Sequence, residues 1–199
     1  DYSAYVNPFI GTGGHGHTFP GAVVPHGMIQ PSPDTRIDGW DACSGYYYAD
    51  STINGFSHTH VSGTGCCDYG DVLLMPTVGK QQYRTTDPQS QRLAYASSFS
   101  HKNEIAEPGY YSVFLDTYQV KAEISSTKRG AIHRYTFPEN AESGFIIDLD
   151  YSLQRQTNSE MEIEVISDTE ICGHKKTTYW AFDQYINFYA KFSKPFSYT

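Results

Sequence analysis

Two histidine pairs, His15/His17 and His58/His60, stand out among the residues that could do chemistry. One residue separates the members of each pair, and alternate residues of an extended backbone point to the same side. Each pair could therefore offer two imidazoles to one metal ion. The alternative is that they are loop histidines held by hydrogen bonds. Because neither pair has an evident third ligand in the sequence, we expect no metal ligand among them.

Carboxylates are the second group of candidates. Hydrolysis of a glycosidic bond uses two of them, one as the acid and the other as the base or nucleophile. Loop aspartates more often form Asx turns. Both interpretations stay open for five aspartates that bracket a group of aromatic and cysteine residues: Asp34, Asp38, Asp41, Asp68 and Asp71.

The segment 40–48 combines a tryptophan, an aspartate and three tyrosines. Sugars present an apolar C–H face and a rim of hydroxyl groups, so aromatic rings beside carboxylates suit a carbohydrate ligand. For Tyr46 and Tyr48 we favour burial on the core side of a strand. Trp40 and Asp41 follow a glycine turn, and we expect these two to face a ligand.

The cysteines do not define a metal or disulfide framework. They allow three complete pairings, among which the sequence does not choose, and no Cys-x-x-Cys zinc motif occurs; they are Cys43, Cys66, Cys67 and Cys172. A nucleophile formed by Cys66 with His58 or His60 is an alternative that lacks an identifiable activating group. The G-x-G-x-x-G match at 11–16 is followed by prolines and no βαβ unit, so it indicates a tight loop and not a nucleotide site.

Composition excludes several classes of protein. The chain has 199 residues, a net charge of −8, 15% aromatic residues and only 18% charged residues. An ordered domain is expected, since disordered chains have few aromatics and many charges. The acidic balance argues against nucleic acid and anionic membranes as partners. No apolar run approaches the ~20 residues of a membrane-spanning helix, so we expect no membrane span.

Two regions of different texture must position these residues. The stretch 7–71 is rich in glycine, proline, histidine and serine, which predicts loops with very short strands. Long irregular segments in compact proteins are usually functional, so we place the site there.

From residue 69 onward, alternating apolar residues predict strands about ten residues apart, which is typical of an antiparallel all-β sandwich. A short helix at 90–95 is the one helical alternative. The last strand candidate ends at Phe192 with nothing to cover the sheet, so we expect a piece of a longer protein. The predicted strands are 72–75 (ending at Pro76), 111–115, 120–124, 131–137, 145–149, 161–166, 170–174 and 186–192.

Long segments of the chain resemble glycoside hydrolase family 92, in order and over nearly the whole length. His26 departs from the family, where an aromatic residue is expected. The matching segments are NPFIGTGGHGHTFPGA (7–22), PSPDTR (31–36), WDACSGY (40–46), GFSHTHVSGTGC (55–66), DYGD (68–71), HRYTFP (133–138) and FSKPF (192–196).

The resemblance implies a calcium-dependent, inverting exo-α-mannosidase that removes terminal α-mannose from glycans, with α-1,2 linkages favoured. In this family an N-terminal β-sandwich, a supersandwich like that of galactose mutarotase, precedes an (α/α)6 barrel. The barrel carries the acid and base and most calcium contacts, and the active site lies between the two. Residues 1–199 would then be the first domain, truncated before its last strands and inactive alone, with no catalytic residue.

The resemblance also implies roles for individual residues. Trp40 would form the wall of the subsite for the leaving sugar. The family's glycan substrates imply a secreted, periplasmic or cell-surface location in a bacterium. A stand-alone carbohydrate-binding module and a complete metal-dependent hydrolase that uses the histidine pairs are the alternatives. Further substrate-binding loop residues at the interdomain cleft would be His15, His17, Asp41, Cys43, His58, His60, Cys66 and Asp68.

Overall fold

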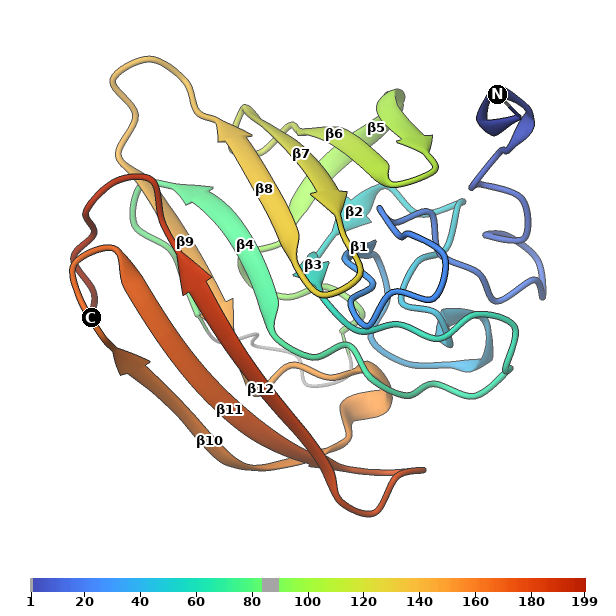
Figure 1. The fold of residues 1–199 in the computed structure, drawn as a ribbon. Coiled ribbons are helices and arrows are strands. Elements are labelled where there is room, and N and C mark those ends of the chain that lie inside the picture. The colour runs from blue at the N-terminus through green and yellow to red at the C-terminus, as the bar shows by residue number, and fades with distance from the viewer. Residues whose placement is uncertain (1, 84–89) are drawn as a thin grey trace.

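The computed structural model describes residues 2–83 and 90–199. Its regular secondary structure consists almost entirely of strands (Figure 1). No helix in this part of the chain is long and apolar enough to cross a membrane. Short 3-10 helices are η1 (Ser3–Tyr5), η2 (Trp40–Ala42) and η3 (Leu153–Arg155). The strands are β1 (Ser32–Asp34), β2 (Thr52–Ile53), β3 (Gly55–Ser57), β4 (Leu73–Val78), β5 (Ser97–Glu107), β6 (Tyr110–Leu115), β7 (Val120–Ser126), β8 (Ala131–Thr136), β9 (Ser143–Asp148), β10 (Thr157–Val165), β11 (Glu170–Thr178) and β12 (Gln184–Lys191).

The strands form sheets with the orders β1-β3-β4-β9, β2-β5-β6-β7-β8 and β10-β11-β12. Every pairing is antiparallel. The prediction of an antiparallel all-β sandwich is therefore confirmed. The N-terminal third is rich in loops, as expected. Its glycines and prolines disfavour long regular elements, so its elements are short 3-10 helices and the short strands β1 to β3.

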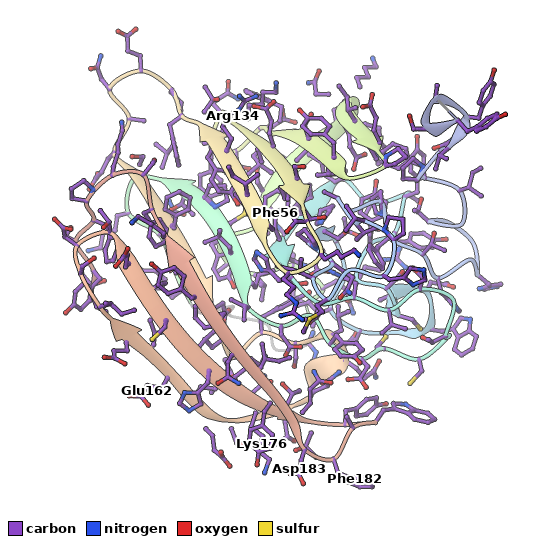
Figure 2. The ribbon with its side chains drawn as sticks, viewed as in Figure 1. Phe56, Arg134, Glu162, Lys176, Phe182 and Asp183 are labelled. Carbon is purple, nitrogen blue, oxygen red and sulfur yellow. The ribbon has the colours of Figure 1, made fainter. Side chains whose placement is uncertain are left out.

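The hydrophobic core lies between the first two sheets. Apolar residues on alternate positions of β6 and β7 point inward, and they meet Phe56 of β3 and Met75 of β4. The ring centroids of Phe56 and Tyr111 lie 6.4 Å apart. Figure 2 shows Phe56 inside the molecule, whereas Arg134 lies at its periphery.

The sheet β10-β11-β12 exposes large apolar side chains. Glu162, Lys176, Phe182 and Asp183 mark its outer surface in Figure 2. The exposed apolar residues of this sheet and its hairpin are Met161, Ile163, Tyr179, Trp180, Phe182, Tyr185 and Tyr189.

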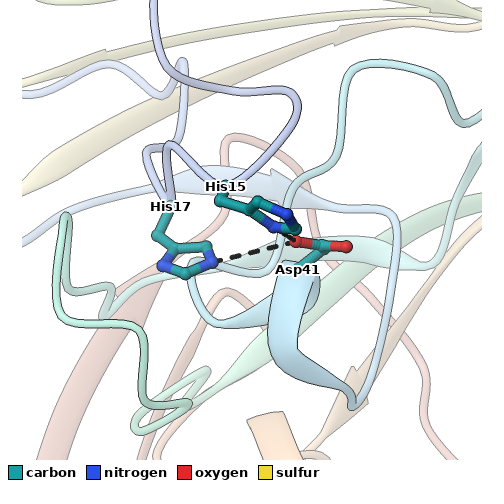
Figure 3. Close-up of side chains that lie close together, drawn as sticks. All are labelled: His15, His17 and Asp41. Atoms are coloured by element: carbon teal, nitrogen blue, oxygen red, sulfur yellow. Dashed lines mark hydrogen bonds and ion pairs between the residues drawn. The ribbon is translucent and has the colours of Figure 1, made fainter.

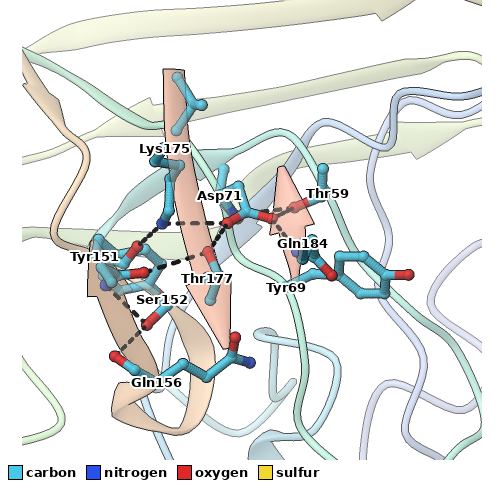
Figure 4. A network of polar contacts seen from close by, with 12 residues as sticks. Thr59, Tyr69, Asp71, Tyr151, Ser152, Gln156, Lys175, Thr177 and Gln184 are labelled. Carbon is cyan, nitrogen blue, oxygen red and sulfur yellow. Dashed lines mark hydrogen bonds and ion pairs between the residues drawn. The ribbon is translucent and has the colours of Figure 1, made fainter. Parts of the chain in front are cut away.

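A buried polar network joins this sheet to the loop region (Figure 4). Asp71, which precedes β4, accepts hydrogen bonds from Thr177 of β11 (3.1 Å) and Gln184 of β12 (3.0 Å). The Lys175 ammonium lies 3.1 Å from the Asp71 carboxylate and donates to the Tyr151 carbonyl oxygen at 2.8 Å. Neither charged side chain is exposed. Burial lowers the pKa of Lys175, and the neighbouring Asp71 opposes that shift.

Three expectations about local structure were wrong. Strand β4 runs through Pro76, because Pro76 pairs with Phe145 of β9 where β4 has left β3, and proline is tolerated on such an edge. The segment 90–95 forms bends and a turn, not a helix. Tyr46 is buried but not on a strand, and Tyr48 is half-exposed and stacks on His101 with ring centroids 4.2 Å apart.

The longest strand, β5, was missed. Its polar residues break the apolar alternation, and its register with β6 shifts between Phe99 and Glu104. Glu104 is buried there and accepts hydrogen bonds from the hydroxyls of Tyr111 (2.6 Å) and Tyr46 (3.0 Å). A satisfied inward carboxylate does not show in a hydrophobic pattern.

Candidate functional site

The loop 11–18 and the short helix η2 bring His15, His17, Trp40 and Asp41 together. Backbone hydrogen bonds close the glycine loop, from Thr18 to the Gly11 carbonyl oxygen at 3.2 Å. The nitrogen of Gly63 donates to the His17 carbonyl oxygen at 2.6 Å, which ties in the loop 63–67. The glycine loop therefore positions these histidines.

The Asp41 carboxylate lies beside His15, with His17 farther away (Figure 3). Its Oδ1 is 2.7 Å from His15 Nδ1 and 3.9 Å from His17 Nε2. The side chain of His15 is 77% exposed, whereas that of His17 is only 6% exposed. The buried imidazole packs edge-on against Trp40, with ring centroids 4.8 Å apart. The cluster thus contains the buried imidazole of His17, the exposed imidazole of His15 and the Asp41 carboxylate near both.

Trp40 is 62% exposed, as its position after a glycine turn predicts. The ring lies against Gly65, where a Cβ atom would come within 2.7 Å of Trp40 Cη2. Gly65 also has a φ of +62°, a conformation that favours glycine. An exposed indole held by a neighbouring loop is a suitable platform for the apolar face of a sugar.

Cys43 and Cys66 lie close to this platform. The Cys43 thiol donates to the Trp40 carbonyl oxygen at 2.6 Å, and burial raises its pKa. Cys66 is half-buried beside Gly65, and its sulfur lies 3.8 Å from the Cys67 carbonyl oxygen. All four cysteines are free thiols. The raised pKa of Cys43 disfavours its thiolate form, so its contact suits packing better than nucleophilic chemistry.

Asp68 lies on the same loop as Cys66, but its side chain contacts a residue that is far away in the sequence. Its Oδ1 accepts hydrogen bonds from Gln156 Nε2 and from the Tyr69 backbone nitrogen, both at 2.9 Å. The other aspartates each have different partners: Asp34 binds His60, Asp38 binds Arg155, Asp41 binds His15 and Asp71 binds Lys175. The five carboxylates are therefore engaged separately, and the structure does not assemble two of them as an acid–base pair.

His60 lies in the interior of this chain. Its Nε2 is 2.8 Å from Asp34 Oδ1 and 3.1 Å from Ser57 Oγ, and its Nδ1 is 2.7 Å from the Gln30 carbonyl oxygen. One ring nitrogen contacts both the serine and the aspartate, so this is not a Ser-His-Asp relay, which needs a different nitrogen for each. The set stabilises β1 against β3.

His58 forms a second group with His133 of β8. His133 was not among the site residues expected from the sequence. His58 Nε2 faces His133 Nε2 at 3.1 Å, and His58 Nδ1 lies 2.6 Å from the Val72 carbonyl oxygen. His133 Nδ1 lies 2.8 Å from the Tyr135 hydroxyl. The strand alternation that places Tyr135 inward also places His133 inward, which is the signal that could have revealed it.

The structure thus divides the predicted site residues into two sets. His15, His17, Trp40 and Asp41 form one cluster, with Cys43 and Cys66 near it. His58 and His60 belong to interior networks, and Asp68 to a neighbouring one. Their roles toward a substrate stay predictions.

The chain is similar to known proteins in both sequence and structure. A family model described as the glycosyl hydrolase family 92 N-terminal domain matches residues 5–199. The structure superposes on the family GH92 α-mannosidase BT3965 from Bacteroides thetaiotaomicron, solved in complex with mannoimidazole, with a TM-score of 0.91. The two share 41% sequence identity over 97% of this chain and 25% of that one.

Two further relatives are more distant. The family GH92 inverting mannosidase BT2199 from Bacteroides thetaiotaomicron has a TM-score of 0.69 and 31% identity, over 87% of this chain and 22% of that one. An uncharacterized secreted glycosidase from Arthroderma benhamiae is 32% identical over 143 residues, which are 70% of this chain and 18% of that protein. This chain therefore spans at most about a quarter of the length of these relatives. The chain belongs to glycosyl hydrolase family 92, and it comprises that family's N-terminal domain.

Proposed function

We propose that the protein carrying this chain is an inverting exo-α-mannosidase that acts on glycans outside the cytoplasm. The observation that carries the proposal is the 41% identity, over 97% of the chain, to an α-mannosidase solved with mannoimidazole. The inverting relative and the secreted glycosidase support the stereochemistry and the location. We take α-1,2-linked mannose as the first substrate to test.

In this proposal the chain supplies sugar-binding loops, and a C-terminal domain supplies the acid and the base. The exposed Trp40 ring offers an apolar platform, and Asp41 and His15 beside it can bond hydroxyl groups. Asp34, Asp38, Asp41, Asp68 and Asp71 are engaged in separate contacts, which supports placing the proton transfers elsewhere. The exposed rings of Tyr185 and Tyr189, on one face of β12, offer a surface for a second domain.

Calcium does not fit the side-chain clusters of this chain. Ca²⁺ takes six to eight oxygen ligands. Within residues 2–83 and 90–199, the one cluster of at least three potential side-chain ligands is His15, His17 and Asp41, which offers two nitrogens and one oxygen. We therefore assign calcium to the C-terminal domain, and derive no step through it here.

The proposal is tested with the full-length protein and mannobiosides of α-1,2, α-1,3, α-1,4 and α-1,6 linkage. Release of mannose is measured with and without calcium, and the anomer released first is identified by NMR. Release of β-mannose from an α-linked substrate is the expected result. The proposal is overturned if the first product is the α-anomer, or if no mannoside is hydrolysed.

Trp40→Ala is expected to reduce kcat/KM for the preferred mannobioside about 10- to 100-fold. The reason is that covering an aromatic side chain contributes about 1.5–3 kcal/mol. The matched control is Trp180→Ala, because Trp180 is 70% exposed on the hairpin between β11 and β12. Steady-state kinetics on both variants checks the prediction.

If Trp40→Ala retains full activity while Trp180→Ala loses it, the sugar-binding surface lies on the other sheet. If the protein binds mannose at Trp40 but hydrolyses no mannoside, the carbohydrate-binding module becomes the better description. Thermal unfolding of both variants shows whether a loss of activity reflects a loss of folded protein.

A further inference from the structure

We propose that His15, His17 and Asp41 form a binding site for a divalent transition-metal ion, with Zn²⁺ as the fitting ion. The three ligand atoms, two imidazole nitrogens and one carboxylate oxygen, all lie within 4.8 Å of one another. The side chains come from the loop 11–18 and from η2 and approach one another, with one Asp41 oxygen near both imidazoles (Figure 3).

The second observation is the state of His17 Nε2. This nitrogen is buried and has no hydrogen-bond partner among the described residues. It points at Asp41, whose Oδ1 is 3.9 Å away, which is beyond hydrogen-bond distance. Buried polar atoms are nearly always paired, since leaving one unpaired is unfavourable. A metal ion between His17 and Asp41 would satisfy the nitrogen with its lone pair.

The spacing suits a tetrahedral ion. Zn²⁺ binds histidine nitrogen and carboxylate oxygen at about 2.0–2.2 Å, which places tetrahedral ligand atoms roughly 3.4 Å apart. The distances from Asp41 Oδ1 to the two imidazoles, 2.7 Å and 3.9 Å, lie on either side of that value. A rotation of the His15 side chain, which is 77% exposed, lengthens the shorter distance, and a shift of the Asp41 carboxylate toward His17 closes the longer one.

The donor set selects the class of ion. Imidazole nitrogens favour Zn²⁺ and Cu²⁺, whereas Ca²⁺ and Mg²⁺ prefer oxygen alone. The site is thus chemically different from a calcium site. Three protein ligands leave a fourth tetrahedral position for water or for an oxygen of a bound molecule.

The backbone holds the buried ligand in place before any ion binds. His17 has a φ of +52°, and its carbonyl oxygen accepts a hydrogen bond from the Gly63 nitrogen at 2.6 Å. Trp40 packs edge-on against the ring and restricts its rotation. Only the side chains of His15 and Asp41 must adjust, so little ordering is needed on binding.

The test is isothermal titration of the full-length protein with Zn²⁺, after chelation and in saturating Ca²⁺. We expect a site that is weakened at least 10-fold in each of His15→Ala, His17→Asn and Asp41→Asn. Asparagine is chosen at position 17 because it tolerates a positive φ. His26→Asn is the matched control, since His26 is an exposed loop histidine with a φ of +58°. The control is expected to bind like the wild type.

Co²⁺ spectroscopy separates this site from the nearby thiols. Tetrahedral d–d bands without a sulfur-to-cobalt charge-transfer band are expected, and Cys66→Ser should leave them unchanged. The proposal is overturned if His15→Ala and His17→Asn bind Zn²⁺ as the wild type does, or if Cys66→Ser abolishes binding. Because binding is measured directly, the result does not depend on whether the protein hydrolyses mannosides. His15→Ala keeps the test valid if His17→Asn fails to fold, since the His15 side chain is mostly in solvent.

Discussion

Replacing Lys175 with alanine is expected to lower the free energy of unfolding of this chain by about 3–5 kcal/mol. The substitution leaves the Asp71 carboxylate buried without its cation, and breaking one half of a buried ion pair is strongly destabilising. Asp71 also anchors β11 and β12 through Thr177 and Gln184, so the loss should loosen that whole sheet. Urea unfolding followed by circular dichroism measures the effect.

Two further variants make this prediction sharper. Lys175→Met combined with Asp71→Asn removes both charges and should recover more than half of the loss, because neither charge is then left unpaired. Lys191→Ala is the control, since Lys191 pairs with Glu170 at 2.9 Å on the same sheet but in solvent. We expect no measurable shift for it. A loss below about 1 kcal/mol for Lys175→Ala would show a solvated pair, as exposed pairs contribute that little.

Acidification is expected to destabilise the chain through His58 and His133. Burial lowers the pKa of both residues. The neighbouring His60 further lowers the pKa of His58, and His58 further lowers the pKa of His133. The Asp34 carboxylate opposes the shift at His58. The unfolded chain therefore binds protons near pH 6.5 while the folded chain does not. Stability should fall as the pH drops below about 6.5, by up to about 1.4 kcal/mol per pH unit for each histidine.

The sign and the source of this effect can be checked together. Urea midpoints are measured at several pH values from about 7.5 to 5, with His133→Gln and the control His26→Asn. His133→Gln should reduce the slope by about one proton, and the exposed His26 should leave it unchanged. A stability that rises on acidification would mean that the pair is charged when folded, which contradicts the neutral arrangement.

That arrangement follows from the hydrogen bonds. If His58 Nδ1 donates to the Val72 carbonyl oxygen, its Nε2 accepts from His133 Nε2. His133 Nδ1 then accepts from the Tyr135 hydroxyl. A proton added to His58 Nε2 would place two N–H groups face to face at 3.1 Å. A proton added to His133 Nδ1 would remove the acceptor of the Tyr135 hydroxyl.

Alternation of apolar residues predicted the regular part of the fold. Strands β6 to β12 follow the predicted segments closely, because each has one face against neighbours and another against water. Strand β5 escaped because its inward Glu104 is polar and is satisfied by tyrosine hydroxyls from elsewhere in the sequence. Long-range compensation of this kind leaves no local pattern.

The site was predictable where its residues are near one another or near a turn. Trp40 was expected outside the core because a glycine turn precedes it, and it is 62% exposed, whereas Asp41 is half-buried. The surroundings of His58 and His60 were not predictable, since their partners His133 and Asp34 are 75 and 26 residues away in the sequence. For His17 the missing fact was likewise a partner, the Asp41 carboxylate on another loop.

The contact between Trp40 and Gly65 has a consequence for the evolution of this surface. Because backbone, and not a side chain, limits how far the indole can tilt inward, the orientation of the ring is a property of two loops at once. A single added methyl group at position 65 would redirect the ring without altering any residue expected to touch a sugar. Selectivity for neighbouring units of a glycan can therefore change by substitution at a position that does not itself contact the ligand.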